Sequence, residues 1–145
     1  SSSLVRSYLE KGAIERASRL LGYYPMLEGL VVEGEKRGST IGFPTANLAV
    51  PADLSIPGRG VYAARAEVDG QLYKAAVNIG SKPTFHADYP ICVEAHLIDF
   101  AGDLYGRRVR LFFLRKIRDE KKFNGVGELM AQIVRDRQSV VDEER

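Results

Sequence analysis

The sequence predicts a mainly β domain, a small antiparallel barrel or sandwich, with helical segments at both ends of the chain. Three observations support this fold class. Between residues 26 and 114, short apolar runs alternate with turn residues at close spacing. No long helical pattern interrupts these runs, so hairpins and loops are expected to connect the strands. Helical periodicity is confined to residues 1–22 and to the region after residue 124.

The first 22 residues are predicted to form two short helices. Leu4, Tyr8 and Leu9 share one face of the first helix, which Gly12 ends. A second apolar stripe follows and stops at Gly22. Its residues are Ile14, Ala17, Leu20 and Leu21.

Short runs of apolar and β-branched residues predict the strands. The sequence Val-Asp-Gly-Gln at 68–71 is typical of a tight hairpin turn. The strands are expected at residues 27–32, 46–50, 61–68, 72–79, 91–100 and 108–114.

The last part of the chain is predicted to be a helix. Apolar residues between 126 and 141 recur near a spacing of 3.6. Asn124 stands where an N-cap is expected. We expect this helix to pack across the barrel.

Length and composition fit one globular domain with a short appendage. The chain has 145 residues, of which 45% are hydrophobic and 28% charged, and its net charge is +2. Disorder is not expected, and the balanced charge does not indicate nucleic-acid binding. No apolar run approaches the roughly 20 residues of a membrane span, and no signal peptide is visible. The single cysteine, Cys92, is expected to be a buried, reduced thiol in a cytoplasmic protein without a membrane partner.

The segment from residue 34 to residue 47 carries the most informative motif, Gly-Glu-Lys-Arg-Gly-Ser-Thr-Ile-Gly-Phe-Pro-Thr-Ala-Asn. Gly34, Gly38 and Gly42 allow close approach of backbone N–H groups to phosphate oxygens. Thr45 and Asn47 lie two apart on an extended segment, so their oxygens point to one side and suit Mg²⁺. The alternative is a glycine-rich turn entering a strand. The segment is neither a Walker A loop nor a dinucleotide-binding GxGxxG motif.

Glu94 is the candidate general base. In the predicted strand it shares a face with Cys92 and His96, while Val93 and Ala95 occupy the other face. A carboxylate in a mostly apolar strand needs a partner or a task, and burial would make it a competent base near neutral pH. The alternative is a carboxylate at a barrel mouth paired with a lysine. His96 is interpreted as a structural histidine, because no ligand spacing for zinc surrounds it.

Aromatic and cationic residues near the end of the chain suggest contacts with a flat heterocycle. Tyr105 follows a strand in a turn, where it could stack on a base or close the barrel end. Arg118, Lys121 and Phe123 lie between the last strand and the last helix. A cation and a ring there could hold a flat ligand, or could form an ordinary charged connector.

Several short motifs occur together in this chain. They are Gly-Phe-Pro-Thr-Ala-Asn at 42–47, Gly-Val-Tyr at 60–62, Asn-Ile-Gly at 78–80, Pro-Thr-Phe at 83–85, Val-Glu-Ala-His-Leu at 93–97, Asp-Phe at 99–100, Asp-Leu-Tyr-Gly at 103–106 and Arg-Asp-Glu-Lys-Lys-Phe at 118–123. In this order and over residues 29–136 the chain resembles the riboflavin kinases, specifically the kinase half of the bacterial bifunctional riboflavin kinase/FAD synthetase.

The resemblance implies a six-stranded antiparallel Greek-key β-barrel with a C-terminal helix and short N-terminal linker helices. It also implies transfer of the γ-phosphoryl group of ATP to the terminal ribityl hydroxyl of riboflavin, which gives FMN and ADP. Glu94 would be the general base, and Thr45 and Asn47 would ligate Mg²⁺ that arrives with ATP. The ATP site would comprise Gly34, Gly38, Ser39, Gly42, Pro44, Thr45, Asn47, Leu97, Asp99 and Tyr105. The flavin site would comprise Arg118, Lys121 and Phe123.

The chain departs from the family pattern at two positions. Ser39 stands where bacterial relatives usually carry a basic residue, and Lys82 stands where arginine is common. Serine at position 39 removes a positive charge that would favour phosphate binding. It leaves a second hypothesis open, a flavin- or FMN-binding module with little turnover.

The N-terminal sequence Ser-Ser-Ser-Leu-Val-Arg resembles the motif that closes the adenylyltransferase half of the bifunctional enzyme. We therefore expect residues 1–22 to be the linker or remnant of a preceding adenylyltransferase domain, covalently linked in the longer protein. Residues 23–145 would be the riboflavin kinase domain. The chain by itself is not expected to make FAD.

Overall fold

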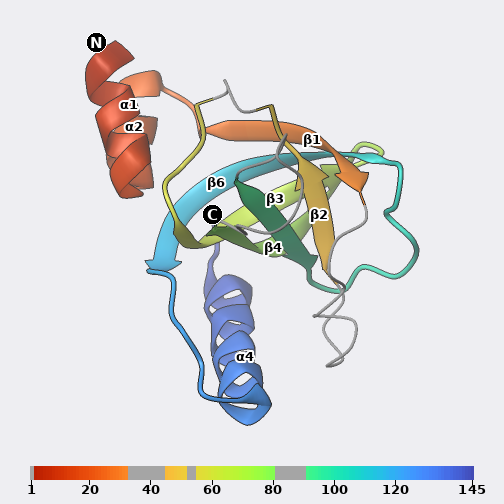
Figure 1. Ribbon diagram of the computed structural model, residues 1–145. Helices are drawn as coiled ribbons and strands as arrows, with labels where there is room; N and C mark the ends of the chain where they lie inside the picture. Colours follow the sequence, from red (N-terminus) through yellow and green to blue (C-terminus); the bar gives the residue numbers. More distant parts are fainter. Residues whose placement is uncertain (1, 33–44, 52–54, 81–90) are drawn as a thin grey trace.

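The computed structural model describes residues 2–32, 45–51, 55–80 and 91–145. Six antiparallel strands form a closed barrel in the order β1-β2-β5-β4-β3-β6 (Figure 1). Because β2 and β3 are not neighbours, and neither are β5 and β6, the barrel has crossover connections of the Greek-key kind. The predicted mainly β class and the expected barrel are confirmed. The strands are β1 (Met26–Val32), β2 (Ala46–Ala49), β3 (Gly60–Val68), β4 (Gln71–Gly80), β5 (Cys92–Leu97) and β6 (Arg108–Arg118).

Two predicted strand ends are wrong by three residues or more, and the others agree with the structure to within one residue. β5 ends at Leu97 rather than at residue 100, because the chain turns there and Asp99 adopts a positive φ of 59°. β6 continues beyond residue 114 to Arg118. Two register shifts in its pairing with β3 let this charged stretch remain in the sheet, and Val61 pairs with Arg118 at its end.

Alternating side chains fill the barrel. In β5, Val93 and Ala95 are fully buried, while Cys92, Glu94 and His96, which alternate with them, are half-buried. Tyr62 and Phe113 meet edge to face in the core, with ring centroids 5.5 Å apart. The Tyr62 hydroxyl donates a hydrogen bond of 2.6 Å to the carbonyl oxygen of Gly58. Burial, and secondarily the charge of Asp119, raise the pKa of Tyr62 to about 12.

The two predicted N-terminal helices are present as α1 (Ser2–Lys11) and α2 (Ile14–Leu21). Leu9, Ile14 and Ala17 belong to the same buried cluster as the barrel residues. The backbone also joins the helices to the barrel, because the Gly58 N–H donates a 2.8 Å hydrogen bond to the Leu9 carbonyl oxygen. Glycine is required at position 58, since a Cβ there would collide with the backbone of Glu10.

The C-terminal helix α4 (Val126–Asp142) contacts the barrel at its C-terminal end and extends away from it at the other (Figure 1). Val140 is buried against Ala63 and Ile98. By contrast, Val126 and Val134 are 59% and 54% exposed. The expectation that α4 packs across the barrel is therefore confirmed only for its last turns.

The predicted N-cap of α4 is wrong. Gly125, not Asn124, occupies the N-cap position, with extended backbone and no capping hydrogen bond from a side chain. None of the helices in the described part of the chain is both long and apolar enough to cross a membrane.

Candidate functional site

Glu94 lies in the middle of a row of polar side chains across three neighbouring strands. In the barrel register, Asn47 of β2 stands opposite Glu94 of β5, and Asn78 of β4 stands opposite Glu94 on its other side. Directly opposed residues share a face of the sheet. Because Val93 and Ala95 point into the core, this row lies on the outer face of the barrel.

The same row continues to the last strand. Asn78 pairs with Val61 of β3, and Val61 pairs with Arg118 of β6. Strands in a sheet are about 4.8 Å apart, so Glu94 and Arg118 are separated by roughly 14 Å along the surface. The candidate general base and a candidate flavin residue thus lie on the same outer face of the barrel, three strands apart.

Cys92 is half-buried beside the candidate base and not fully buried as expected. Its thiol lies 3.5 Å from Oε1 of Glu94 and 3.8 Å from Oδ1 of Asn47, and can donate to either oxygen. The side chains of Asn47 and Glu94 therefore approach one another closely. This contact brings a candidate metal ligand next to the candidate base.

Thr45 and Asn47 are both half-buried, with Thr45 directly before β2. Asn47 pairs with Val32, the last residue of β1. The glycine-rich segment connects these two strands. The predicted residues Gly34, Gly38, Ser39, Gly42 and Pro44 lie outside the described residues, as does Lys82.

Tyr105 is 60% exposed in the turn that precedes β6. Its backbone N–H donates a 2.9 Å hydrogen bond to Oδ1 of Asp103. The turn is joined to the end of β1, since the Gly106 N–H donates to the Val31 carbonyl oxygen at 3.0 Å. Tyr105 therefore sits near the strand end from which the glycine-rich segment departs.

Leu97 and Asp99 do not share the face of Glu94. The Leu97 side chain is 6% exposed and belongs to the barrel core. Asp99 lies in the turn after β5, with a side chain 90% exposed and 3.7 Å from the Arg137 guanidinium of α4. Leu97 can therefore meet a ligand only through its backbone, whereas Asp99 offers its carboxylate.

The structure brings the three candidate flavin residues together. The Arg118 guanidinium carbon lies 5.8 Å from the centre of the Phe123 ring, and the Lys121 ammonium nitrogen lies 5.7 Å from it. Both distances fit cation–π contacts. Arg118 also forms an ion pair of 2.9 Å with Asp136 of α4.

Three residues near the site were missed by the sequence reasoning. Asn78 belongs to the quoted Asn-Ile-Gly motif, but only the strand register places it beside Glu94. Asp136 carries no local signal, because its partner Arg118 is 18 residues away. Glu120 lies against the outer face of Gly80, where any Cβ would collide with its carboxylate.

The oxygen donors fit a magnesium ion that is already bound to phosphates. No group of three or more His, Cys, Asp or Glu residues gathers into a metal site within the described ranges. The hydroxyl of Thr45 and the amide of Asn47 are neutral oxygen donors, which suit Mg²⁺ held mainly by a nucleotide. Glu94 is the carboxylate nearest to Asn47 in this row.

The barrel thus carries Asn47, Glu94 and Asn78 side by side on its outer face, and a cation–aromatic cluster on the same face at β6. The sequence profile of the riboflavin kinase family matches residues 21–142. The chain belongs to the riboflavin kinase family.

Two relatives carry the same name, bifunctional riboflavin kinase/FMN adenylyltransferase. The protein from Bacillus subtilis is 43% identical over 97% of this chain and 45% of its own length. The protein from Escherichia coli K12 is 42% identical over 94% of this chain and 43% of its own length. The chain therefore spans less than half the length of these relatives.

Two solved structures share the fold. A crystal structure from Streptococcus pneumoniae, described as a macrolide-efflux protein, superposes with a TM-score of 0.92 and 35% identity. The superposition covers 99% of this chain and 47% of the Streptococcus pneumoniae chain. Riboflavin kinase from Trypanosoma brucei superposes with a TM-score of 0.58 and 26% identity, over 81% of this chain and 77% of that chain.

Proposed function

We propose that the chain catalyses transfer of the γ-phosphoryl group of ATP to the terminal ribityl hydroxyl of riboflavin, which forms FMN and ADP. One observation carries the proposal. The row that contains Asn47 and Glu94 ends at Arg118, beside the ring of Phe123. A flavin lying along this row would place its ring at the aromatic end and its ribityl chain at the carboxylate end.

Glu94 acts on the attacking hydroxyl. Its carboxylate accepts a hydrogen bond from the hydroxyl and receives its proton as the phosphoryl group is transferred. Phosphoryl transfer depends mainly on positioning and on charge stabilisation, so orientation of the hydroxyl is the larger part of this role. The approach of Asn47 and Cys92 to Glu94 limits where the carboxylate can lie.

Thr45 and Asn47 would hold Mg²⁺ together with the phosphates of ATP. Held there, Mg²⁺ would supply positive charge that neutralises the transferred group. Gly34, Gly38, Ser39, Gly42 and Pro44 complete the ATP site by the family pattern. Leu97 contributes its backbone, while Asp99 and Tyr105 contribute exposed side chains.

The flavin site consists of Arg118, Lys121 and Phe123. Two cations beside one ring form a surface on which a flat heterocycle can stack.

In the whole protein, the domain acts beside a covalently linked adenylyltransferase domain. The relatives' names and the share of their length that is matched support this arrangement. Residues 1–22 would form the linker and residues 23–145 the kinase domain, in a cytoplasmic enzyme with neither a nucleic-acid nor a membrane partner. The packing of Leu9, Ile14 and Ala17 into the barrel core means that such a linker is firmly joined to the kinase domain.

The purified chain, incubated with riboflavin and Mg-ATP, should yield FMN, which chromatography with fluorescence detection resolves from riboflavin. Chelation of Mg²⁺ should abolish the product. Asn47→Ala should raise the Mg²⁺ concentration needed for half-maximal rate by about tenfold, because one oxygen ligand is lost.

Two results would contradict the proposal. Saturable riboflavin binding without FMN would indicate the flavin-binding module instead. If the chain neither binds riboflavin nor forms FMN, both functions are ruled out.

A further inference from the structure

Asp136 is a buried carboxylate whose contacts all lie within the protein fold. The residue is 5% exposed on α4. It accepts hydrogen bonds from Nε of Arg118 at 3.0 and 3.2 Å and from Nη2 of Arg118 at 2.9 Å. Gln132, one turn earlier on α4, donates a further hydrogen bond of 2.9 Å to Oδ1. With both oxygens engaged in this way, Asp136 acts through Arg118 rather than on a ligand.

These contacts determine which part of Arg118 can meet a ligand. The Nε and Nη2 edge, which would otherwise form a two-point contact with a phosphate, is occupied by Asp136. The remaining nitrogen, Nη1, donates to the carbonyl oxygen of Asp119 at 3.0 Å. These bonds use three of the five guanidinium N–H groups, so the planar face and one N–H on each Nη atom are left for a ligand.

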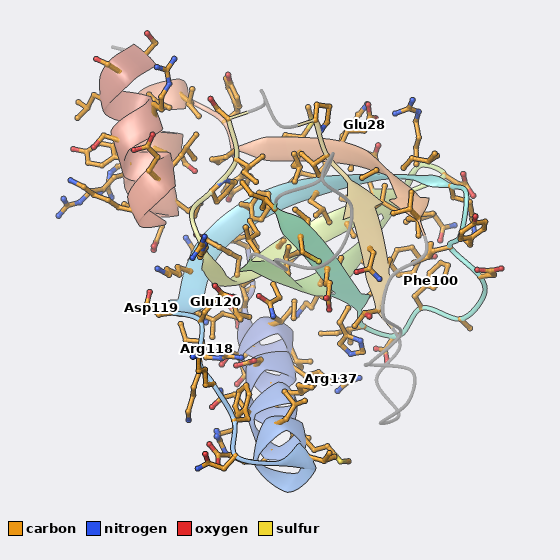
Figure 2. All side chains as sticks on the ribbon, viewed as in Figure 1. Glu28, Phe100, Arg118, Asp119, Glu120 and Arg137 are labelled. Carbon is orange, nitrogen blue, oxygen red and sulfur yellow. The ribbon has the colours of Figure 1, made fainter. Side chains whose placement is uncertain are left out.

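The surroundings of that face are aromatic and cationic. Phe123 lies 5.8 Å from the guanidinium carbon and brings its ring to the same cluster. The Arg118 side chain is 19% exposed, so it is fixed in place yet remains accessible. Figure 2 shows Arg118 at the end of β6, Asp119 and Glu120 in the chain that follows it, and Arg137 on the other side of α4.

We propose that Asp136 is a positioning residue that presents Arg118 to riboflavin as a flat stacking surface for the isoalloxazine ring and withholds its Nε–Nη2 edge from phosphate. The inference rests on the proposed function and adds to it the role of α4 in selecting the flavin. It follows that Asp136 controls affinity for riboflavin and has little influence on affinity for ATP.

The test compares Asp136→Asn with Asp142→Asn, a matched change at an exposed position of the same helix. Initial rates give KM for riboflavin and KM for ATP separately. Quenching of riboflavin fluorescence in the presence of ADP gives affinity without turnover. Asp136→Asn should raise both riboflavin constants by about tenfold and leave KM for ATP within about twofold, because a charge-assisted contact fixes the flavin end alone. Asp142→Asn should change none of the three.

A double-mutant cycle separates positioning from general loss of structure. Arg118→Gln should itself weaken riboflavin binding by about tenfold. Adding Asp136→Asn to Arg118→Gln should then change riboflavin affinity less than about twofold, because the residue that Asp136 positions is already absent. If Asp136→Asn does not fold, Gln132→Leu provides the same test, with an expected rise of about threefold in KM for riboflavin.

Three results would overturn the inference: an unchanged riboflavin KM, a rise confined to the ATP KM, or additive losses in the cycle. Failure of the proposed function is recognised separately. If the unaltered chain binds riboflavin but forms no FMN, the kinase activity is refuted while the fluorescence measurement still tests Asp136. If it does not bind riboflavin, both proposals fall.

Discussion

The helices at the two ends of the chain are attached to the barrel by different kinds of contact. Leu9, Ile14 and Ala17 of the N-terminal helices join the barrel core as apolar side chains. At the other end, α4 has a small apolar contact at Val140, and polar groups supply much of the remaining attachment.

Those polar contacts gather at the end of α4. The Lys74 ammonium donates a 2.6 Å hydrogen bond to the Val141 carbonyl oxygen, and Arg65 donates one of 2.9 Å to that of Glu143. Cations at a helix C-terminus satisfy its last carbonyl groups and complement its dipole. Arg115 adds an ion pair of 2.8 Å with the Glu143 side chain.

The two kinds of contact have different consequences: the apolar contacts stabilise the fold, whereas the polar contacts orient side chains of the proposed site. Apolar burial is non-directional and stabilises α1 and α2 on the barrel without fixing the orientation of a polar group. Hydrogen bonds are directional, so the contacts of α4 can hold Arg118 in one orientation. The helix that touches the proposed flavin site is thus the one attached mainly through polar groups.

The largest expected effect comes from the apolar attachment. Ile14 is fully buried, so Ile14→Ala should lower the free energy of unfolding by about 3 kcal/mol through lost burial and a residual cavity. Denaturant titration measures this loss. Leu20→Ala, on the same helix but 49% exposed, is the control and should cost less than about 0.5 kcal/mol. A loss for Ile14→Ala as small as that expected for Leu20→Ala would show that α2 does not belong to the core.

A smaller effect is expected when acid protonates Glu143, because this weakens the attachment of α4 to the barrel and lowers the free energy of unfolding. Hydrogen bonds from Arg145 and then Arg115 lower the pKa of Glu143 from 4.5 to about 2, against the opposing effect of burial. Because the folded pKa is depressed, this stabilisation is present above pH 4.5 and is lost as the pH falls towards 2. Glu143→Gln should cost about 2 kcal/mol at pH 7 and progressively less below pH 4.5.

Unfolding titrations of both proteins across this pH range measure the difference. A Glu143→Gln deficit that remains constant from pH 7 to pH 2 would contradict the ionic account of the α4 attachment.

The smallest effect should come from the exposed ion pair of α4. The Arg137 guanidinium lies 3.7 Å from Asp99, whose side chain is 90% exposed. Exposed pairs contribute little, so Arg137→Gln should change the free energy of unfolding by less than about 0.5 kcal/mol in thermal or denaturant unfolding. A loss above about 1 kcal/mol would mean that this pair, and not only the contacts at the helix end, holds α4.

The strand pattern could be predicted because it is local. Val93, Ala95 and Leu97 alternate with polar residues, and the structure buries all three. The extent of β6 could not be predicted, since a run of cations discourages a strand assignment. Those cations remain in the sheet because Arg115 and Arg118 find carboxylates on the distant residues Glu143 and Asp136.

The site was predictable as a set of residues and not as an arrangement. Thr45, Asn47 and Glu94 are visible in motifs, and the Arg118–Phe123 cluster follows from proximity in sequence. The alignment of Asn47, Glu94 and Arg118 on one face depends on the register of five strands, which is set by contacts between residues far apart in the chain. The wrong N-cap at Asn124 has a similar cause, because the start of α4 depends on where the segment that leaves β6 turns back towards the barrel (Figure 1).

The most direct test of the account is to measure riboflavin binding and FMN formation on Glu94→Gln. Glu67→Gln, a matched change on β3 at a position paired with Arg110, serves as the control. Glu94→Gln should keep riboflavin affinity within about threefold and lose at least about 100-fold in the rate of FMN formation, because the acceptor for the hydroxyl proton is gone. Retention of the rate within a few-fold of the unaltered chain would contradict the proposed role of Glu94 and of the row it occupies.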